Sequence, residues 1–275
     1  MRNNEMYIPY MMKMFNNLEK SETFNFNYLI YTNNNEDKTL DLLKESKKKN
    51  LEIIDESLSE NIKKMGKCEK LYHLREKLLN ATKKRNFDFL LMIDSDILFN
   101  LKIVEETVKE LEKGVFDAIT TNTLFGYYSM YFFYDTFAFK DNNGKKLESK
   151  LEKINFSLEH CFSKKTYKVK SSFSGFWITT KKTLLSKNPS YLDKIEPNKC
   201  EHENFNSKFN IGLKPNANPF RLETGDTKQN YDKAFNIIDK NLMDNRSDTK
   251  NALYFIFGTV IFIGLLLMWY FLIKH

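Results

Sequence analysis

Short apolar runs that suit β-strands alternate with amphipathic stretches that suit α-helices over the first half of the chain. The strand-like runs cover residues 26–31, 51–54, 89–93 and 116–120. Between them, apolar residues recur at the three- and four-residue spacing of one helix face. This alternation is typical of a parallel β-sheet covered by helices. We therefore expect an α/β fold.

The run at residues 89–93 is the most informative, because two carboxylates follow it at once. Its five apolar residues predict a strand buried on both faces, and Asp94 and Asp96 come directly after it, with Ser95 between them. Residues i and i+2 of a strand point the same way, so the two acids can hold one cation at the carboxyl edge of the sheet. Oxygen ligands suit Mg²⁺ or Mn²⁺, which share such sites with substrate phosphates. Asp-Ser-Asp is also an ordinary strand-ending turn, but its position after a buried run favours the metal site.

A second polar cluster has the sequence Cys-Glu-His-Glu-Asn-Phe-Asn at residues 200–206. Glu201 and Glu203 are candidates for a catalytic general base, and His202 is a candidate base or metal ligand. The same sequence also suits the charged start of a helix. Gly175 lies in a further strand-like stretch, where a glycine provides either a close backbone approach to a bound cofactor or donor, or a bulge.

The formal charge of +7 does not point to nucleic acid. Lysine outnumbers arginine by 38 to 5, and the basic residues are spread along the chain. This indicates a solvated lysine-rich surface, because arginine is expected at bidentate contacts to phosphates or bases. The three cysteines show no Cys-x-x-Cys spacing, so neither a disulfide framework nor a zinc knuckle is indicated, and a reducing compartment fits best.

The C-terminal part of the chain contains a membrane-span signal. Residues 252–273 carry no charge, and these 22 residues reach about 33 Å as a helix, enough to cross a hydrocarbon core of about 30 Å. No signal-like run precedes the domain. We therefore expect a single-pass C-terminal anchor that holds the rest of the chain on the cytosolic face of a membrane. The expected divisions are a catalytic domain at 1–230, a juxtamembrane linker at 231–251 and the span at 252–273.

The order of these motifs resembles that of the GT-A class of nucleotide-sugar glycosyltransferases. The resemblance rests on Arg2-Asn3-Asn4-Glu5 with Tyr7-Ile8, on Tyr31-Thr32-Asn33-Asn34-Asn35 with Asp37-Lys38-Thr39-Leu40, on Leu74-Arg75 and on Ile93-Asp94-Ser95-Asp96. Further on, Tyr134-Asp135-Thr136 with Lys140-Asp141 is similar to a stretch of fungal capsular-polysaccharide mannosyltransferases, and Gly175-Phe176-Trp177 and Cys200-Glu201-His202 are similar to elements of glycosyltransferase-like proteins of large DNA viruses.

This resemblance implies a Rossmann-like, mixed and mostly parallel sheet flanked by helices. It also implies transfer of a sugar from a UDP- or GDP-sugar to a glycan, protein or lipid acceptor. By the same resemblance, Asp94 and Asp96 would hold a Mn²⁺ or Mg²⁺ ion that neutralises the leaving diphosphate, and His202 would complete the metal shell. Glu201 would deprotonate the acceptor hydroxyl in an inverting reaction.

The resemblance further implies that Asn34, Asp37 and Arg75 contact the nucleotide. Domains of this class usually begin with a β-strand whose end touches the nucleotide base, and Met1 falls at the loop that would follow it. We therefore expect either a translation start further upstream or a sheet without its first strand.

Two other functions are compatible with these motifs. A tail-anchored scaffold that has lost its donor pocket is favoured by the absent first strand. An aspartate-nucleophile phosphatase also starts its site with a strand and Asp-x-Asp. Ile97 and Leu98 disfavour the phosphatase, since that family carries a small residue and a threonine at these positions.

Overall fold

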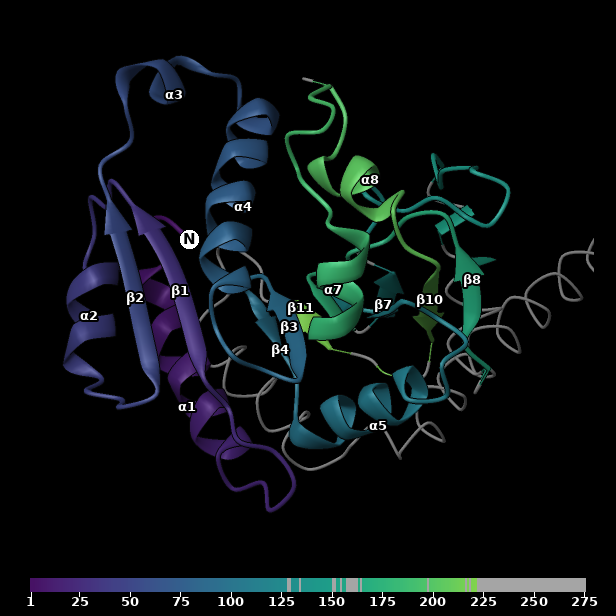
Figure 1. Ribbon diagram of the computed structural model, residues 1–275, viewed down its shortest axis with the longest axis horizontal. Helices are drawn as coiled ribbons and strands as arrows, with labels where there is room; N and C mark the ends of the chain where they lie inside the picture. Colours follow the sequence, from purple (N-terminus) through teal and green to yellow (C-terminus); the bar gives the residue numbers. More distant parts are fainter. Residues whose placement is uncertain are drawn as a thin grey trace, which may run out of the picture.

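Figure 1 is a ribbon diagram of the computed structural model of the protein. It describes residues 1–127, 130–133, 135–149, 152–153, 155–156, 163, 165–196, 198–215, 217 and 219–221. The predicted linker at 231–251 and span at 252–273 lie outside this part of the chain. Within the described part, no helix has the length and apolar character needed to cross a membrane.

The N-terminal part of the fold is a pair of parallel strands with helices around it. The elements are a 3-10 turn (Glu5–Tyr7), α1 (Ile8–Leu18), β1 (Tyr28–Asn33), α2 (Thr39–Glu45), β2 (Leu51–Glu56), α3 (Glu60–Lys64) and α4 (Lys67–Lys83). Strands β1 and β2 pair in parallel and in register from Tyr28 with Leu51 to Asn33 with Glu56. The strand–helix–strand order predicted for this part is confirmed.

A five-stranded sheet forms the centre of the molecule, in the order β3-β9-β5-β10-β8. Its strands are β3 (Phe89–Ile93), β5 (Ala118–Thr121), β8 (Tyr167–Val169), β9 (Phe176–Thr180) and β10 (Ile211–Lys214). The β5–β10 pairing is parallel, whereas β3–β9, β5–β9 and β10–β8 are antiparallel. The prediction of a mixed sheet is confirmed, but "mostly parallel" is wrong. Strand β9 comes from a distant part of the sequence, inserts between β3 and β5, and runs antiparallel to both.

A smaller sheet lies beside the Asp-Ser-Asp turn, in the order β4-β11-β6-β7. Its strands are β4 (Ile97–Leu98), β6 (Leu124–Tyr127), β7 (Met130–Phe133) and β11 (Phe220–Arg221). Strands β6 and β7 pair antiparallel, so the aromatic-rich segments 124–127 and 130–133 form a strand pair. The remaining helices are α5 (Leu101–Leu111), α7 (Lys181–Lys187) and α8 (Glu201–Asn206).

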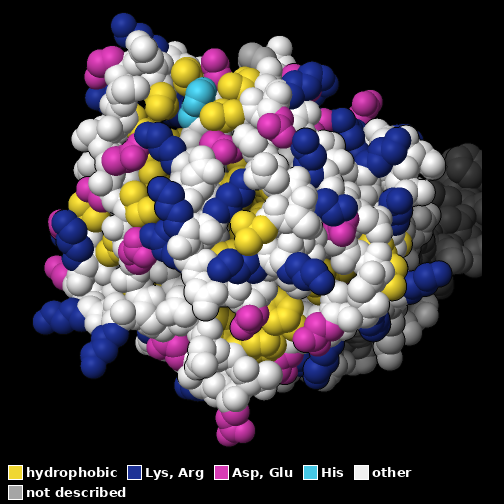
Figure 2. Space-filling view, viewed as in Figure 1, with side chains coloured by type: hydrophobic (Ala, Val, Ile, Leu, Met, Phe, Trp, Pro, Cys, Tyr) yellow, Lys and Arg dark blue, Asp and Glu magenta, His cyan; other side chains and the backbone are white. Residues whose placement is uncertain are grey.

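Helices cover both faces of the central sheet. On one face, Phe176 and Ile178 of β9 pack in a cluster with residues of α1 and α5. On the other face, Trp177 packs with residues of α4, α7 and α8. Alternate residues of a strand point to opposite faces, so one strand contributes to both cores. The basic side chains on the surface in Figure 2 are interspersed with acidic ones, as expected for a solvated lysine-rich surface.

Strand β3 lies at the edge of the central sheet, with β9 as its partner. Each of its five residues is only partly buried. Its two faces nevertheless pack against different cores, Phe89, Leu91 and Ile93 against one and Leu90 and Met92 against the other. The predicted packing on both faces is therefore confirmed, but the burial is incomplete, because an edge strand lacks a neighbour on one side. Strand β1 likewise pairs with β2 alone among the described strands.

The N-terminal residues connect the β1–β2 sheet to the Asp-Ser-Asp turn that follows β3 of the central sheet. The Met1 amino group donates to the carbonyl oxygen of Tyr31 at 2.5 Å, and the Asn4 backbone N–H donates to Thr39 Oγ1 at 2.6 Å. From the other side, the Ser95 hydroxyl donates to Asn4 Oδ1 at 2.7 Å. The first residues of the chain therefore lie between the end of β1 and the Asp-Ser-Asp turn.

Candidate active site at the end of strand β3

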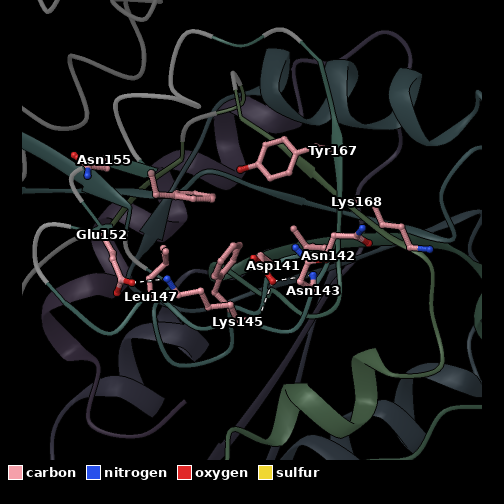
Figure 3. Close-up of a pocket in the computed structure, with 12 residues that line it drawn as sticks. Asp141, Asn142, Asn143, Lys145, Leu147, Glu152, Asn155, Tyr167 and Lys168 are labelled. Carbon is pink, nitrogen blue, oxygen red and sulfur yellow. Dashed lines mark hydrogen bonds and ion pairs between the residues drawn. The ribbon is translucent and has the colours of Figure 1, made fainter.

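A cavity of about 640 Å³ lies away from the predicted site residues (Figure 3). Its described lining residues all come from positions 139–169. Three of its charged residues, Asp141, Lys145 and Glu152, have partners. Asp141 Oδ1 accepts the backbone N–H of Lys145 at 2.7 Å, and the Lys145 ammonium pairs with Glu152 at 2.7 Å. The predicted metal ligands and base candidates lie elsewhere, in the turn after β3 and in helix α8.

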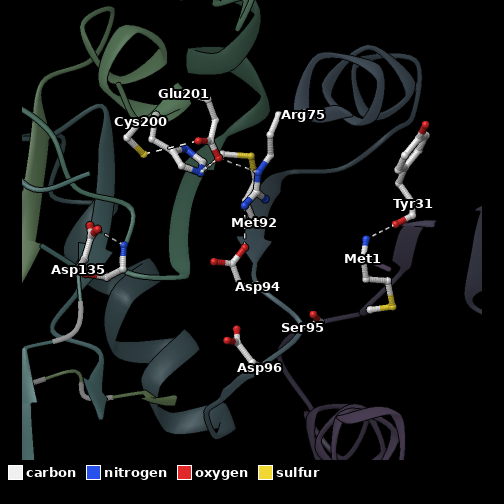
Figure 4. Close-up of polar contacts among 12 residues, drawn as sticks. Met1, Tyr31, Arg75, Met92, Asp94, Ser95, Asp96, Asp135, Cys200 and Glu201 are labelled. Atoms are coloured by element: carbon white, nitrogen blue, oxygen red, sulfur yellow. Dashed lines mark hydrogen bonds and ion pairs between the residues drawn. The ribbon is translucent and has the colours of Figure 1, made fainter. Parts of the chain in front are cut away.

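The carboxylates of Asp94 and Asp96 lie one after the other along the turn and face the same space (Figure 4). The turn is fixed by its backbone, because the Asp94 N–H donates to the carbonyl of Gly175 at 3.0 Å and the Ile97 N–H donates to the carbonyl of Asp94 at 3.2 Å. Both side chains remain partly exposed, Asp94 at 28% and Asp96 at 20%. The predicted pair of acids is therefore formed and reachable.

Arg75 of helix α4 lies between Asp94 and Glu201 (Figure 4). Its Nη2 donates to Asp94 Oδ1 at 2.7 Å, and its Nε is 3.5 Å from Glu201 Oε1. Burial alone lowers the pKa of Arg75, but the charges of Asp94 and Glu201 outweigh it and hold the pKa above its ordinary value. The guanidinium is thus a fixed cation that neutralises two carboxylates.

Asp96 has a different arginine as its partner. Arg221 Nε donates to Asp96 Oδ2 at 3.0 Å. Burial and the neighbouring charge of Asp94 raise the pKa of Asp96, and the opposing effect of Arg221 does not cancel them. A positive charge in addition to that of Arg221 would therefore be favourable beside Asp96.

Gly175 makes the close approach that its sequence position indicated, but the partner is the chain itself. Ser174 and Gly175 both have left-handed backbones, with φ of 52° and 64°. A Cβ on Gly175 would lie 2.5 Å from Ile97 Cγ1 and 3.5 Å from Asp94 Oδ2. This glycine therefore positions the Asp-Ser-Asp turn, and its role as a ligand contact stays a prediction.

A buried carboxylate holds the loop that contains Gly175. Asp135 Oδ2 accepts the N–H groups of Phe173 at 2.7 Å and Ser174 at 2.9 Å, and the Ser172 hydroxyl at 3.0 Å. Its Oδ1 accepts the N–H of Ala138 at 3.1 Å. Asp135 therefore fixes the loop that in turn accepts the Asp94 N–H.

His202 of helix α8 is held away from the two aspartates. Its ring stacks on Phe173 with centroids 3.7 Å apart, its Nδ1 lies 3.3 Å from the Tyr191 hydroxyl, and its Nε2 lies 3.4 Å from Glu201 Oε1. Burial, with the charge of Arg75, holds the pKa of His202 well below its ordinary value, so the ring is neutral.

The predicted metal shell of Asp94, Asp96 and His202 is not formed. Among the residues that the structure describes, no three His, Cys, Asp or Glu side chains lie close enough to hold one ion. Asp94 forms an ion pair with Arg75. The histidine ring contacts Glu201, Tyr191 and Phe173 instead. Metal binding by Asp94 and Asp96 stays a prediction.

The two glutamates of α8 lie in different surroundings. Glu201 belongs to the network of Arg75 and Asp94. Glu203 forms ion pairs with Lys140 and Lys146, and its side chain is only 4% exposed. Both predicted base candidates are therefore buried, but only Glu201 is linked to the aspartates.

Asn34 and Asp37 organise the N-terminal segment. Asn34 Oδ1 accepts the N–H of Leu58 at 3.0 Å, and the Asp37 carboxylate accepts the N–H groups of Glu5 and Thr39, each at 3.0 Å. Burial raises the pKa of Asp37, but the hydrogen bonds outweigh it and leave the pKa below its ordinary value. Nucleotide contact by these two residues stays a prediction.

Sequence reasoning missed Arg221 and the loop-holding role of Asp135. Asp135 had a signal, since it lies in the Tyr-Asp-Thr motif, but its partners are at residues 172–174. Arg221 had none, because its contact with Asp96 joins positions 125 residues apart.

No protein-family model matches the chain, and no curated protein matches it. Among solved structures, the chain is similar to S. aureus TarS residues 1–349, with 15% identity and a TM-score of 0.47 over 86% of this chain and 68% of that one. It is also similar to TarS 1–349 in complex with UDP-GlcNAc, with 14% identity and a TM-score of 0.49 over 83% and 58% of the two chains. For a longer TarS the values are 12% and 0.49, over 88% and 38%. The site described above rests on its own geometry, and the resemblance to viral and fungal proteins stays a prediction.

Proposed function

We propose that this protein transfers a sugar from a UDP- or GDP-sugar to an acceptor, with Mn²⁺ or Mg²⁺ as cofactor. The observation that carries the proposal is the pair formed by Asp94 and Asp96. Their carboxylates face one space at the end of β3, and burial together with the charge of Asp94 raises the pKa of Asp96. Two hard oxygen ligands with room for phosphate oxygens fit an ion of this kind. When bound, the ion neutralises charge on the leaving diphosphate.

The remaining residues of the network position these groups. Arg75 keeps the Asp94 carboxylate in place through its 2.7 Å hydrogen bond. Gly175 accepts the Asp94 N–H at 3.0 Å and so fixes the start of the turn. Such positioning matters, because displacement of a reacting group by about 1 Å can cost a hundredfold in rate.

We assign the general base to Glu201. Its carboxylate is part of the Arg75–Asp94 network, whereas both oxygens of Glu203 are engaged by lysines. In this step Glu201 accepts the proton of the acceptor hydroxyl. The hydroxyl oxygen bonds to the anomeric carbon as the bond to the diphosphate breaks.

We further propose that residues 252–273 anchor the protein in a membrane, with the catalytic domain on the cytosolic face. The support for this is the absence of charge over these 22 residues. The step assigned to Glu201 belongs to an inverting reaction, and the proposal covers any UDP- or GDP-sugar donor and any acceptor hydroxyl.

One specific observation favours the non-catalytic scaffold as a second candidate. Both aspartates already have arginine partners, and β3 is an edge strand. A scaffold of this kind would bind no donor.

The test is a panel of UDP- and GDP-sugars with the full chain in detergent, with Mn²⁺, Mg²⁺ or EDTA. We expect donor hydrolysis or transfer with one of the metals, loss of turnover in EDTA, and loss in Asp96→Ala. Asp193→Ala is the control, because this aspartate forms a surface pair with Lys208 at 3.2 Å and is 45% exposed. Metal-independent turnover that survives Asp96→Ala contradicts the proposal. If no nucleoside diphosphate stabilises the protein by the roughly 2.7 kcal/mol expected at a hundred times its Kd, the scaffold is favoured.

A further inference from the structure

The two ring nitrogens of His202 face two different groups. Nδ1 lies 3.3 Å from the Tyr191 hydroxyl, and Nε2 lies 3.4 Å from Oε1 of Glu201, the residue assigned above as the general base. Tyr191 and His202 are both buried, with exposed fractions of 0% and 2%. The ring is shielded from solvent, so its nitrogens depend on these two protein groups for hydrogen bonds.

The chemistry of these groups decides which ring nitrogen of His202 carries the hydrogen. The ring is neutral, because burial and the charge of Arg75 hold its pKa well below the ordinary value. A neutral imidazole has one N–H and one acceptor nitrogen, and a carboxylate only accepts. Nε2 must therefore carry the hydrogen that points to Glu201, and Nδ1 then accepts from the Tyr191 hydroxyl. The opposite tautomer would set the lone pair of Nε2 against a carboxylate oxygen.

The Tyr191 hydroxyl has a second contact that competes for its hydrogen. The thioether sulfur of Met92 lies 3.9 Å from the hydroxyl oxygen. A thioether is a weak acceptor, whereas the unprotonated nitrogen of a neutral imidazole is a full one. The hydroxyl hydrogen therefore goes to Nδ1 of His202.

Neighbouring rings hold the histidine and the tyrosine in place. The His202 ring stacks on Phe173 with centroids 3.7 Å apart and planes 9° apart. The Tyr191 ring stacks on Phe205 with centroids 4.3 Å apart, and the Tyr191 N–H donates to Glu76 Oε2 of α4 at 2.7 Å. Stacking fixes the plane of the imidazole, and the tyrosine selects which edge of the ring points to it. The Nε2 edge therefore keeps its direction.

Glu201 has donors beside both carboxylate oxygens (Figure 4). Oε1 faces Arg75 Nε at 3.5 Å and His202 Nε2 at 3.4 Å, and Oε2 faces the Cys200 thiol at 3.6 Å. Within the described part of the chain, the buried Nε2 has no hydrogen bond of normal geometry. Catalytic hydrogen bonds are often long in a free enzyme and tighten when substrate binds. The ring thus directs a donor at Glu201 that is not yet fully engaged.

We infer that His202, held by Tyr191 as the Nε2–H tautomer, is a positioning residue for Glu201. This rests on the function proposed above. When the acceptor binds, Nε2–H donates to Glu201 Oε1 and keeps the carboxylate oriented while it accepts the proton of the acceptor hydroxyl. The ring gives up no proton in this step. The inference gives His202 a role other than the metal ligation expected from sequence.

The first measurement concerns the ring nitrogens and needs no substrate. The full chain, labelled with ¹⁵N-histidine and held in detergent, is studied by long-range ¹H–¹⁵N correlation spectroscopy at neutral pH. The His202 signals are those that disappear in His202→Phe. We expect a protonated Nε2 and a hydrogen-bonded, unprotonated Nδ1. In Tyr191→Phe, the Nδ1 signal should move toward that of a nitrogen without a hydrogen bond. A protonated Nδ1 in the wild type overturns the inference.

The second measurement is turnover in the donor panel described above. His202→Phe keeps a ring that can stack on Phe173 but has no N–H, so we expect kcat to fall about tenfold or more with KM within about twofold. His202→Gln should recover part of this loss, because its amide places a donor near the position of Nε2. Tyr191→Phe should lose less kcat than His202→Phe, since the ring N–H remains.

The matched control is Tyr72→Phe. Tyr72 is also 0% exposed, but its hydroxyl donates to the backbone carbonyl of Glu196 at 3.4 Å. This variant loses a buried hydroxyl of the same kind without touching the histidine. We expect the Nδ1 signal and kcat to match those of the wild type. Equal losses of kcat in Tyr72→Phe and Tyr191→Phe would reflect the core as a whole and would overturn the inference.

The outcomes separate this inference from the proposed function. If the wild type turns over and His202→Phe keeps its kcat, the positioning role is wrong and the proposed function stands. An Nδ1 signal that Tyr191→Phe does not move overturns the part assigned to the tyrosine. If the wild type turns over no donor, the proposed function and the positioning role are both wrong. If either phenylalanine variant unfolds, the wild-type nitrogen signals and the kcat of His202→Gln decide.

Discussion

The Arg75 guanidinium donates to the Asp94 carboxylate across 2.7 Å, which ties helix α4 to the end of strand β3. The same guanidinium faces Glu201 at 3.5 Å, so helix α8 joins the connection. Helix α4, strand β3, which follows it in the sequence, and the distant helix α8 therefore meet at one cation. Its removal should affect the stability of the fold as well as the chemistry proposed for it.

Arg75→Met is expected to lower the free energy of unfolding by about 3 kcal/mol, because it leaves the buried Glu201 carboxylate without the cation that faces it. Arg75→Lys should lose less, since it keeps the charge. Urea unfolding followed by circular dichroism measures both. Arg85→Met is the control, because its pair with Glu52 is more exposed and should be worth less than about 1 kcal/mol. Equal losses of unfolding free energy in the two methionine variants would show that the contacts of Arg75 contribute no more to stability than an exposed ion pair.

Glu201→Gln and Glu203→Gln separate chemistry from stability. Under the proposed mechanism, Glu201→Gln should lower kcat by about a hundredfold or more, because the amide cannot accept the acceptor proton. Glu203→Gln should keep kcat within a few-fold, since Glu203 pairs with Lys140 and Lys146, but should lower the melting temperature. Steady-state kinetics and thermal unfolding on the same preparations make the comparison. A larger kcat loss in Glu203→Gln would reverse the assignment of the base.

Gly175→Ala is expected to destabilise the protein by about 3 kcal/mol, since a left-handed backbone disfavours a side chain and the added Cβ meets Ile97. Gly66→Ala is the control, because nothing lies within 4 Å of a Cβ there and the backbone is not left-handed. It should cost less than about 1 kcal/mol. Chemical unfolding of the two variants measures the difference, which should vanish if the loop can shift away from Ile97.

Asp135→Ala leaves three backbone N–H groups and a hydroxyl without their acceptor, so we expect a loss of about 3 kcal/mol in unfolding free energy. Asp135→Asn, which keeps one carbonyl oxygen, should lose less. Asp141→Ala is the control, since this carboxylate also accepts two backbone N–H groups but in an exposed turn. We expect amide hydrogen exchange at Phe173 and Ser174 to quicken in Asp135→Ala and to stay unchanged in Asp141→Ala.

The alternation of strand and helix, and the two acids after β3, could be predicted from sequence because both depend on local patterns. Asp94 and Asp96 share a direction through the backbone of a strand and the turn that follows it. Their position directly after an apolar run is visible in the sequence alone, so the pair was found. The antiparallel direction of β9 could not be predicted. It follows from the insertion of β9 between β3 and β5, which is a long-range pairing that no local pattern shows.

The partners of the site residues were also beyond the sequence pattern. His202 was expected at the metal because histidine is a common ligand, but the ring stacks on Phe173, 29 positions earlier in the chain. Arg221 reaches Asp96 through the register of a two-residue strand. Such contacts are set by long-range pairing, which no local spacing encodes.

The buried, neutral ring of His202 predicts a loss of stability at acid pH. Its pKa in the folded protein lies well below the ordinary value of 6.5, through burial and the charge of Arg75. Below pH 6.5 the unfolded chain therefore takes up a proton that the folded ring beside Glu201 and Tyr191 does not. This contribution is present above pH 6.5 and is lost as the pH falls, by about 1.4 kcal/mol between pH 7.5 and 5.5. Urea unfolding of the wild type and of His202→Gln at both pH values isolates it, because the variant should lack this part of the pH dependence. His73→Gln, which keeps His202, should retain it, and equal pH dependence in wild type and His202→Gln would show that the ring is protonated in the folded state.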